Sequence, residues 1–366
     1  MAEDILNLIN NNKLKWTILC LISTTILIQL TPPNIDRLPF KDTFFRVTFP
    51  KLNDPENTML LIAGGRPWGY LISDIPNETR IIRITSNLIK KLRYGENPHQ
   101  ESAIYSKNNK LDIEQIHGKK LSYNNYNDIF SALVISKSLP KNIGTVIVKH
   151  TNPCGVSIHK NHKKSYQLAL ACDPISAFGG IVSCNYKINK SLALELNKIF
   201  LEVIIANGFE KKALKILKKK KNLRIINANN LSLKNIDNFK SNFNSILTQS
   251  PDINSLSSKN FKVVSKIKPT RLELKNLIFA FNVCRFVKSN AIVIASNEST
   301  VGIGSGQPSR LDSCQIAINK MKKFQNLENQ EIVAASDAFF PFVDGIEKLV
   351  QAGVSAIIQP SGSIRD

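Results

Sequence analysis

A lysine and a histidine stand side by side where an apolar segment of the sequence gives way to a turn. The β-branched run at residues 146–148 is followed closely by Pro153 and Gly155, which is typical of a core strand ending in a tight turn. Successive strand side chains point to opposite faces, so Lys149 and His150 can reach one pocket only where the strand ends. An imidazole beside an ammonium group could transfer protons and stabilise an oxyanion, although the pair also fits an ordinary surface strand end.

Strand-like and helix-like patterns alternate from residue 88 onward, and they supply the elements that would position these side chains. This alternation predicts a layered α/β architecture. A polar, Asn-rich stretch at residues 222–260 looks like a boundary between two similar halves. Strands are predicted at 145–148, 180–183, 203–206, 291–295 and 356–359, and helices at 128–137, 191–200, 272–288, 311–323 and 345–352.

The six cysteines are scattered and form no C-x-x-C pair. Most stand among apolar neighbours, which favours reduced thiols in the core of a cytosolic protein. Pro153-Cys154 is reminiscent of a zinc-deaminase motif, but Ser157 takes the place of the required second cysteine, so we predict no metal site. A thiol nucleophile at Cys154 beside His150 stays open, and packing of the turn is favoured. The six are Cys20, Cys154, Cys172, Cys184, Cys284 and Cys314.

Residues 1–88 carry no pattern that we can assign to a domain. The apolar run Trp16–Leu30 has 15 residues, whereas a membrane-spanning helix needs about 17–25. Glu3 and Asp4 dilute the basic lead of a secretory signal, and the run is followed by Pro32-Pro33. We therefore favour an interior strand or helix, with a membrane or signal role as the alternative.

Five further segments combine glycine or proline with charged, amide or aromatic side chains, as loops around a ligand often do. The glycines at 302–306 could present backbone amides to an anion ahead of a helix, but they lack the Gly-Lys-Ser/Thr of a P-loop, so a plain strand–helix turn stays open. The segments are Arg93–Gln100, Leu121–Asp128, Asp173–Ile181, Ser289–Val293 with Gly302–Arg310, and Ser336–Gly345.

Taken with Val146–Gly155, these segments closely resemble the aminoimidazole-carboxamide ribotide (AICAR) formyltransferase part of the bifunctional purine-biosynthesis enzyme. The resemblance covers roughly Leu88 to Asp366, with the motifs in the family's order. It implies two similar layered α/β subdomains resembling the cytidine-deaminase-like fold, which we place at 89–240 and 261–366. Residues 1–88 stay an unassigned N-terminal region without the cyclohydrolase domain's motifs, which leaves cyclohydrolase (hydrolase) activity in doubt for this chain.

Two positions depart from the family's pattern. Val343 stands where relatives often carry arginine, and the chain stops at Asp366, where the family continues to basic residues that help hold a phosphate. We therefore expect the second subdomain to be truncated at its C-terminus.

The resemblance implies a reaction and three catalytic residues. The family transfers a formyl group from its co-substrate 10-formyltetrahydrofolate to the 5-amino group of 5-aminoimidazole-4-carboxamide ribonucleotide, with no metal required. By resemblance, His150 removes the amine proton, Lys149 lies near the formyl group and the leaving nitrogen, and Asn290 steadies the formyl oxygen. An uncharged amide suits that task because it keeps its donor protons at any pH.

Other residues are assigned by resemblance to binding of the two substrates. Arginine suits a phosphate because its planar fork gives paired charge-assisted bonds, and glycine lets the backbone approach a ligand closely. Aromatic rings can pack against the flat pterin ring of the folate. The candidates are Arg93, Tyr94, Arg310 and Glu202 for the nucleotide, Phe339, Phe340, Pro341 and Asp344 for the folate, and Asn125 and Gly179 as further contacts.

The net charge of +21 invites a nucleic-acid interpretation. The densest run, Lys218–Lys221, continues a helical pattern and favours a solvated helix face over a polyanion site. A nucleotide and a polyglutamylated folate also suit a positive field, so a catalytically decayed basic protein that binds nucleotides or RNA is the alternative function. We expect a cytoplasmic homodimeric enzyme with sites across the interface, no dedicated nucleic-acid partner and no membrane association.

Overall fold

The computed structural model describes residues 58–63, 82–229, 231, 238–252 and 256–362 of the chain. The chain divides into two compact units, of which the smaller takes in residues 1–85 and 237–250. Its described part contains strand β1 (Thr58–Ala63) and an antiparallel hairpin of β10 (Asn238–Asn242) and β11 (Ser245–Gln249). The apolar run Trp16–Leu30 lies outside the described residues.

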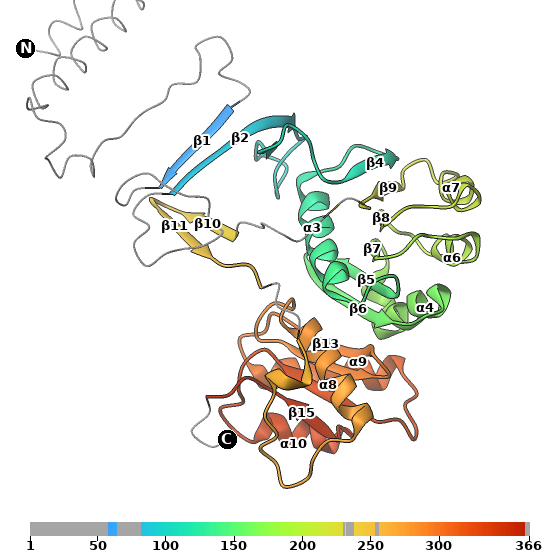
Figure 1. The fold of residues 1–366 in the computed structure, drawn as a ribbon, viewed down its shortest axis with the longest axis vertical. Coiled ribbons are helices and arrows are strands. Elements are labelled where there is room, and N and C mark those ends of the chain that lie inside the picture. Colours follow the sequence, from blue (N-terminus) through green and yellow to red (C-terminus); the bar gives the residue numbers. More distant parts are fainter. Residues whose placement is uncertain (1–57, 64–81, 230, 232–237, 253–255, 363–366) are drawn as a thin grey trace, which may run out of the picture. The chain divides into compact units, whose positions relative to one another are not determined.

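The larger unit is built on a ten-stranded mixed sheet, which confirms the predicted α/β class (Figure 1). Its order is β15-β14-β12-β13-β6-β5-β7-β8-β9-β4. The strands are β4 (Glu114–His117), β5 (Gly144–Lys149), β6 (Asn152–Ile158), β7 (Ile181–Cys184), β8 (Val203–Ala206), β9 (Arg224–Asn227), β12 (Ile292–Ser296), β13 (Ser299–Gly304), β14 (Val333–Ser336) and β15 (Ala356–Ile358). Strands β2 (Ile82–Lys91) and β3 (Ala103–Ser106) precede them in the chain and pair antiparallel in a separate three-stranded sheet of order β1-β2-β3.

The order of elements repeats along the larger unit. An antiparallel hairpin lies between two helices in each half, β5–β6 between α3 and α4 and β12–β13 between α8 and α9. In the first half, β7 pairs antiparallel with β5 and parallel with β8. In the second half, β14 likewise pairs antiparallel with β12 and parallel with β15. The helices are α3 (Tyr123–Ser138), α4 (His162–Cys172), α5 (Pro174–Ala177), α6 (Lys190–Leu196), α7 (Lys211–Leu217), α8 (Arg271–Cys284), α9 (Arg310–Phe324) and α10 (Asp344–Gln351).

The two halves meet in one continuous sheet where β13 pairs with β6, at Ser299 and Ser157. The subdomain limits 89–240 and 261–366 and the cytidine-deaminase-like fold stay predictions. One sequence expectation changes: β9 lies within the stretch at 222–260 that we interpreted as a boundary, and it pairs with β8 in the sheet.

Alternation along the strands separates two apolar layers on the sheet. Val146 and Val148 of β5 pack in a cluster with α3 and α8, whereas Ile147 packs in a second cluster with α4, α6 and α7. Ile292 and Ile294 of β12 pack with α9 and α10 in a third. Because neighbouring strand residues face opposite ways, α3 and α8 cover one face and the other helices cover its opposite.

Glycines let the helices pack closely on the hairpins. A Cβ added to Gly155 of β6 would lie 1.8 Å from the carbonyl oxygen of Ala169 in α4, and one added to Gly304 of β13 would lie 1.9 Å from that of Ser313 in α9. Gly302 and Gly304 therefore serve strand–helix packing, because they lie inside β13 rather than in a loop before α9.

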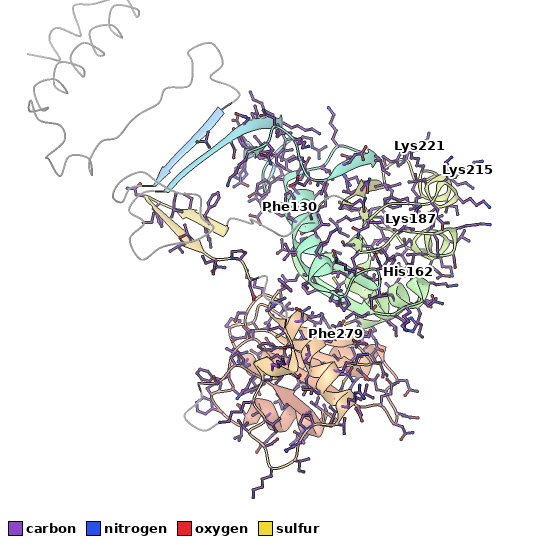
Figure 2. All side chains as sticks on the ribbon, viewed as in Figure 1. Phe130, His162, Lys187, Lys215, Lys221 and Phe279 are labelled. Atoms are coloured by element: carbon purple, nitrogen blue, oxygen red, sulfur yellow. The ribbon has the colours of Figure 1, made fainter. Side chains whose placement is uncertain are left out.

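The lysine run at the end of α7 is mostly solvated, as predicted, with one exception. Lys215 and Lys221 are exposed (Figure 2). Lys220 instead donates hydrogen bonds to the carbonyl oxygens of Asn197 and Ile199, both at 2.8 Å. No helix in the described residues is long and apolar enough to cross a membrane.

Replacing Gly155 with alanine should destabilise the protein by about 1–3 kcal/mol or more, because α4 must move away from β6. Gly304→Ala should cost a similar amount, since the equivalent helix approaches as closely. Urea unfolding of both variants measures the losses. A loss below about 0.5 kcal/mol in either variant would contradict the packing described here.

Candidate active site

Lys149 and His150 lie where β5 turns back into β6. Lys149 and Asn152 are paired across the hairpin, so His150 and Thr151 form a two-residue turn. Both turn residues have positive φ, 51° and 63°, as a type I′ turn requires. Asn and Gly are the usual residues there, and a β-branched residue such as threonine is rare at positive φ.

Two side chains of α3 hold this turn. The N–H of Thr151 donates to Asp128 Oδ1 at 2.7 Å, and Ser131 Oγ donates to the carbonyl oxygen of Thr151 at 2.6 Å. Asp128 and Ser131 are one helical turn apart, so they reach the same loop. The position of His150 is therefore set by the packing of α3 on the sheet.

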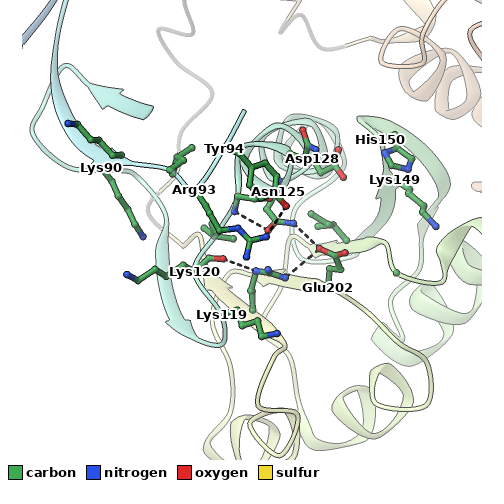
Figure 3. Close-up of a pocket in the computed structure, with 18 residues that line it drawn as sticks. Lys90, Arg93, Tyr94, Lys119, Lys120, Asn125, Asp128, Lys149, His150 and Glu202 are labelled. Atoms are coloured by element: carbon green, nitrogen blue, oxygen red, sulfur yellow. Dashed lines mark hydrogen bonds and ion pairs between the residues drawn. The ribbon is translucent and has the colours of Figure 1, made fainter. Parts of the chain in front are cut away.

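A cavity of about 770 Å³ opens beside the turn, and both Lys149 and His150 line it (Figure 3). Of the predicted site residues, it also brings together Arg93, Tyr94, Asn125, Gly179 and Glu202. The described lining carries seven cationic side chains and two carboxylates. The cations are Lys90, Lys91, Arg93, Lys119, Lys120, Lys149 and Arg224, and the carboxylates are Asp128 and Glu202.

Lys149 is oriented by the segment that follows α5. Its Nζ donates to the carbonyl oxygen of Phe178 at 2.8 Å. The next residue, Gly179, has φ of +73°, and its N–H donates to the carbonyl oxygen of Phe200 at 2.9 Å. Glycine is needed here because the left-handed conformation is strained for other residues. The ammonium group is thus held at the wall of the cavity.

Arg93 and Tyr94 act as a local pair. The guanidinium lies 4.7 Å from the centroid of the Tyr94 ring, and its Nη2 donates to the phenol oxygen at 3.0 Å. The remaining guanidinium donors stay available to an anion in the cavity, because this bond uses one nitrogen of the fork.

Asn125 has a structural task that the sequence interpretation missed. It completes a capping box at the start of α3, because its N–H donates to Ser122 Oγ and its Oδ1 accepts from the Ser122 N–H. Its Nδ2 donates to Glu202 Oε2 at 2.9 Å, and the same oxygen lies 3.4 Å from Arg224 Nη1. Asn125 and Arg224 therefore fix the carboxylate of Glu202 in the cavity wall.

The thiol of Cys154 is unsuited to nucleophilic attack. Burial raises its pKa to about 12, so the thiol is protonated at neutral pH. The packing role favoured from the sequence agrees with this environment, because the side chain is buried in a core cluster.

Asn290 and Arg310 belong to a second polar cluster, outside the described lining of the cavity. Both amide donors of Asn290 are used, by the carbonyl oxygens of Gln307 and Pro308 at 2.8 and 2.9 Å. Its Oδ1 accepts from Arg310 Nη2 at 2.7 Å, and Arg310 Nη1 pairs with Asp337 at 2.5 Å. Asn290 therefore connects the start of β12 to the start of α9.

One side chain joins this cluster to the turn. Asn152 Nδ2 donates to the carbonyl oxygen of His150 at 3.2 Å, and its Oδ1 accepts from the N–H of Lys288 at 3.0 Å. Lys288 is two residues before Asn290 in the sequence. The Asn152 side chain thus links the β5–β6 hairpin to the loop before β12 by hydrogen bonds.

The folate candidates also lie outside that lining. Phe340 is 5% exposed and packs in the core cluster below α9 and α10, whereas Phe339 is 39% exposed. Pro341 and Asp344 are exposed, and Asp344 begins α10, where its Oδ1 accepts the Gly345 N–H. Their contacts with a ligand stay predictions.

Comparison with known proteins places this chain in a family. Residues 69–320 match the family model of the AICARFT/IMPCHase bienzyme. The chain belongs to this family. Among its relatives are the bifunctional purine biosynthesis proteins PurH of Persephonella marina, 45% identical over 283 residues, and of Acetivibrio thermocellus, 41% identical over 293 residues.

The chain spans about half the length of the curated relatives it matches. The two alignments cover 75% and 78% of this chain but 54% and 56% of the relatives. A third, the PurH protein of Thermoanaerobacter sp., is 46% identical over 279 residues, 75% of this chain and 54% of that protein. The match to the bienzyme family begins at residue 69, inside the region that we left unassigned.

Asp337 should stabilise the second cluster in a pH-dependent way. Burial raises the pKa of its carboxyl, but hydrogen bonds from Ser289, Arg310 and the Ala291 N–H together lower it below the ordinary value. A lowered pKa stabilises the fold above the unfolded-state pKa of about 3.9, and this contribution is lost as the pH falls through the folded-state pKa. Asp337→Asn should therefore lose about 1–3 kcal/mol near pH 7, and a smaller amount near pH 4.

Urea unfolding of the wild type and the variant at both pH values measures this difference. Asp112→Asn is the matched control, because Asp112 is exposed and outside both clusters. An equal loss at the two pH values would show that the charge of Asp337 is not what stabilises the cluster.

Proposed function

We propose that this chain transfers the formyl group of 10-formyltetrahydrofolate to the 5-amino group of 5-aminoimidazole-4-carboxamide ribonucleotide, a step of de novo purine biosynthesis. The observation that carries the proposal is the joint placement of Lys149 and His150 on a strained turn beside a cavity of about 770 Å³. Membership of the bienzyme family supports it and gives no support to the alternative of a decayed RNA-binding protein.

The charge of the cavity suits the nucleotide. Seven cationic side chains line the described cavity against two carboxylates, and one of these, Glu202, is already paired with Arg224. A phosphate on the ribose would lower the repulsion among the cations, and Arg93 has donors left for it. The Glu202 carboxylate, held from two sides, is placed to accept from an amine or amide of the base.

The chemistry needs a base, a donor for the developing oxyanion and a protonated leaving nitrogen. The 5-amino nitrogen forms a bond to the formyl carbon while His150 takes its proton, and the carbonyl oxygen becomes an oxyanion. The bond from carbon to N10 of the folate then breaks, and the proton passes to N10. Lys149 is the last residue of β5, next to His150 of the turn, where its ammonium group can stabilise the oxyanion or the leaving nitrogen.

The rest of the proposed site, with its catalytic amide, a nucleotide-binding arginine and the folate-binding aromatic residues, lies outside the described lining of the cavity. We propose that the active form is a cytoplasmic homodimer, in which a second copy brings its Asn290, Arg310 and Phe339 toward the first copy's Lys149 and His150. The cavity supports this proposal because its described lining includes none of these three residues.

The direct test is formyl transfer by the purified chain with both substrates, followed by the absorbance of tetrahydrofolate release and by mass detection of the formylated ribotide. Product formation that requires both substrates is expected. If neither product forms while the ribotide binds, the chain is a nucleotide-binding protein and the proposed reaction is wrong.

His150→Ala should lower turnover by at least about 10²-fold, because a positioned base contributes about 10²–10⁴. Calorimetric titration should show ribotide binding within about tenfold of the wild type, since the phosphate contacts remain. His159→Ala is the control, because His159 is exposed and outside the cavity. Near-normal turnover of His150→Ala would remove this imidazole from the mechanism.

A further inference from the structure

The two halves of the sheet hold their hairpin turns in the same way. The β12–β13 turn, Asn297-Glu298, has positive φ of 50° and 51°, as the His150-Thr151 turn has 51° and 63°. In each hairpin the register shifts just before the penultimate residue of the first strand, between Ile147 and Val148 and between Ile294 and Ala295.

The helix before each hairpin accepts the same backbone hydrogen bond. The N–H of the second turn residue donates to Asp128 Oδ1 at 2.7 Å in the first half, and to Asn276 Oδ1 at 2.8 Å in the second. Each acceptor stands six positions after its capping-box residue, Ser122 for Asp128 and Thr270 for Asn276. Asp128 and Asn276 are therefore equivalent.

The second half shows what the turn itself requires. Asn276 is fully buried and supports a turn with two left-handed residues through an uncharged amide oxygen. An amide can thus accept the turn's backbone hydrogen bond, in a half where Lys275 of the same helix also pairs with Glu298 of the turn at 2.5 Å. The negative charge at Asp128 needs a different explanation.

The surroundings of Asp128 supply that explanation. Asp128 is half-buried and lines the same cavity as His150. Burial raises its pKa, an effect enhanced by Glu202 and opposed by hydrogen bonds from the N–H groups of Thr151 and His150 and by the charge of His150. Other charged groups that line this cavity are Lys90, Lys91, Arg93, Lys119, Lys120, Lys149 and Arg224.

We propose that Asp128 is a positioning residue with a second task, in which its carboxylate stabilises the imidazolium that His150 becomes when it accepts a proton. The reaction step rests on the proposed function, in which the proton comes from the 5-amino group and passes on to N10 of the folate. The electrostatic part concerns His150 alone and holds whatever the substrate. The backbone hydrogen bond and the charge stabilisation can be separated, because Asn276 makes the backbone hydrogen bond without carrying a charge.

The variant that separates them is Asp128→Asn, which reproduces the residue type of the second half. Diethyl pyrocarbonate modifies neutral imidazole, so mass spectrometry of the His150 peptide between about pH 5 and 8 reports its protonation. In Asp128→Asn, modification of His150 at a given pH in this range should increase relative to the wild type, as expected when a nearby opposite charge that favours the protonated ring is lost. His159 in the same digest is the internal reference, and Asp112→Asn is the control variant.

This measurement needs no substrate, so it decides the electrostatic proposal even if the chain transfers no formyl group. An unchanged modification profile at His150 would overturn it. Failure of Asp128→Asn to fold would also overturn the proposal, because an amide at position 128 should accept the turn's hydrogen bond as Asn276 does. Asp128→Ala removes both the acceptor of the Thr151 N–H and the charge, so this variant should be less stable than Asp128→Asn.

Steady-state kinetics test the step that rests on the proposed function. Asp128→Asn should lower kcat by about tenfold with KM for the ribotide nearly unchanged, and the acid-side fall of turnover should move to lower pH. The same substitution in a His150→Ala background should have no further effect, because Asp128 acts through that imidazole. An additional loss in the double variant would show that Asp128 acts independently of His150.

Discussion

The hydrogen bond from the Thr151 N–H to the Asp128 carboxylate fixes the turn that carries His150 and follows Lys149. Two consecutive non-glycine residues at positive φ are each expected to cost about 1–3 kcal/mol, so the turn persists only because its surroundings hold it. Asp128 and Ser131 hold it from α3, and the paired strands β5 and β6 hold its ends. Lys149 and His150 therefore reach one cavity although they are neighbours on a strand.

The internal repeat explains how such a turn arises in the sheet. A capping box starts the helix before each hairpin, a residue six positions later accepts the turn's N–H, and glycines in the second strand admit the following helix. One half holds its turn through a buried neutral amide, whereas the other places a lysine, a histidine and a carboxylate around a cavity. The same scaffold therefore carries a turn beside the proposed active site in one half and a turn outside it in the other.

The sequence predicts those elements whose apolar pattern is uninterrupted. The strand predicted at 203–206 coincides with β8, and the patterns for α9 and α10 agree within a residue. β6 and β13 were not predicted because Pro153 and three glycines interrupt their patterns. The close approach of α4 and α9, which only the folded structure shows, explains the glycines. The motif ending at Asp128 was recognised, but its role depends on a contact with a turn 23 residues away.

Asn290 shows why residue type alone could not settle the site. An amide is a sensible donor to an oxyanion, yet both donors of this one are bound to carbonyl oxygens, and its acceptor is bound to Arg310. To bind an oxyanion it must release one of these bonds. The bond to Pro308 is exposed and the bond to Gln307 is half-buried, so the Pro308 carbonyl can be released to water. The exchange is favourable only if the Asn290 amide forms a stronger hydrogen bond with the developing oxyanion than with a neutral carbonyl oxygen. Charge-assisted hydrogen bonds are generally the stronger kind. In the proposed reaction, such a donor would therefore discriminate the transition state from a bound neutral formyl group.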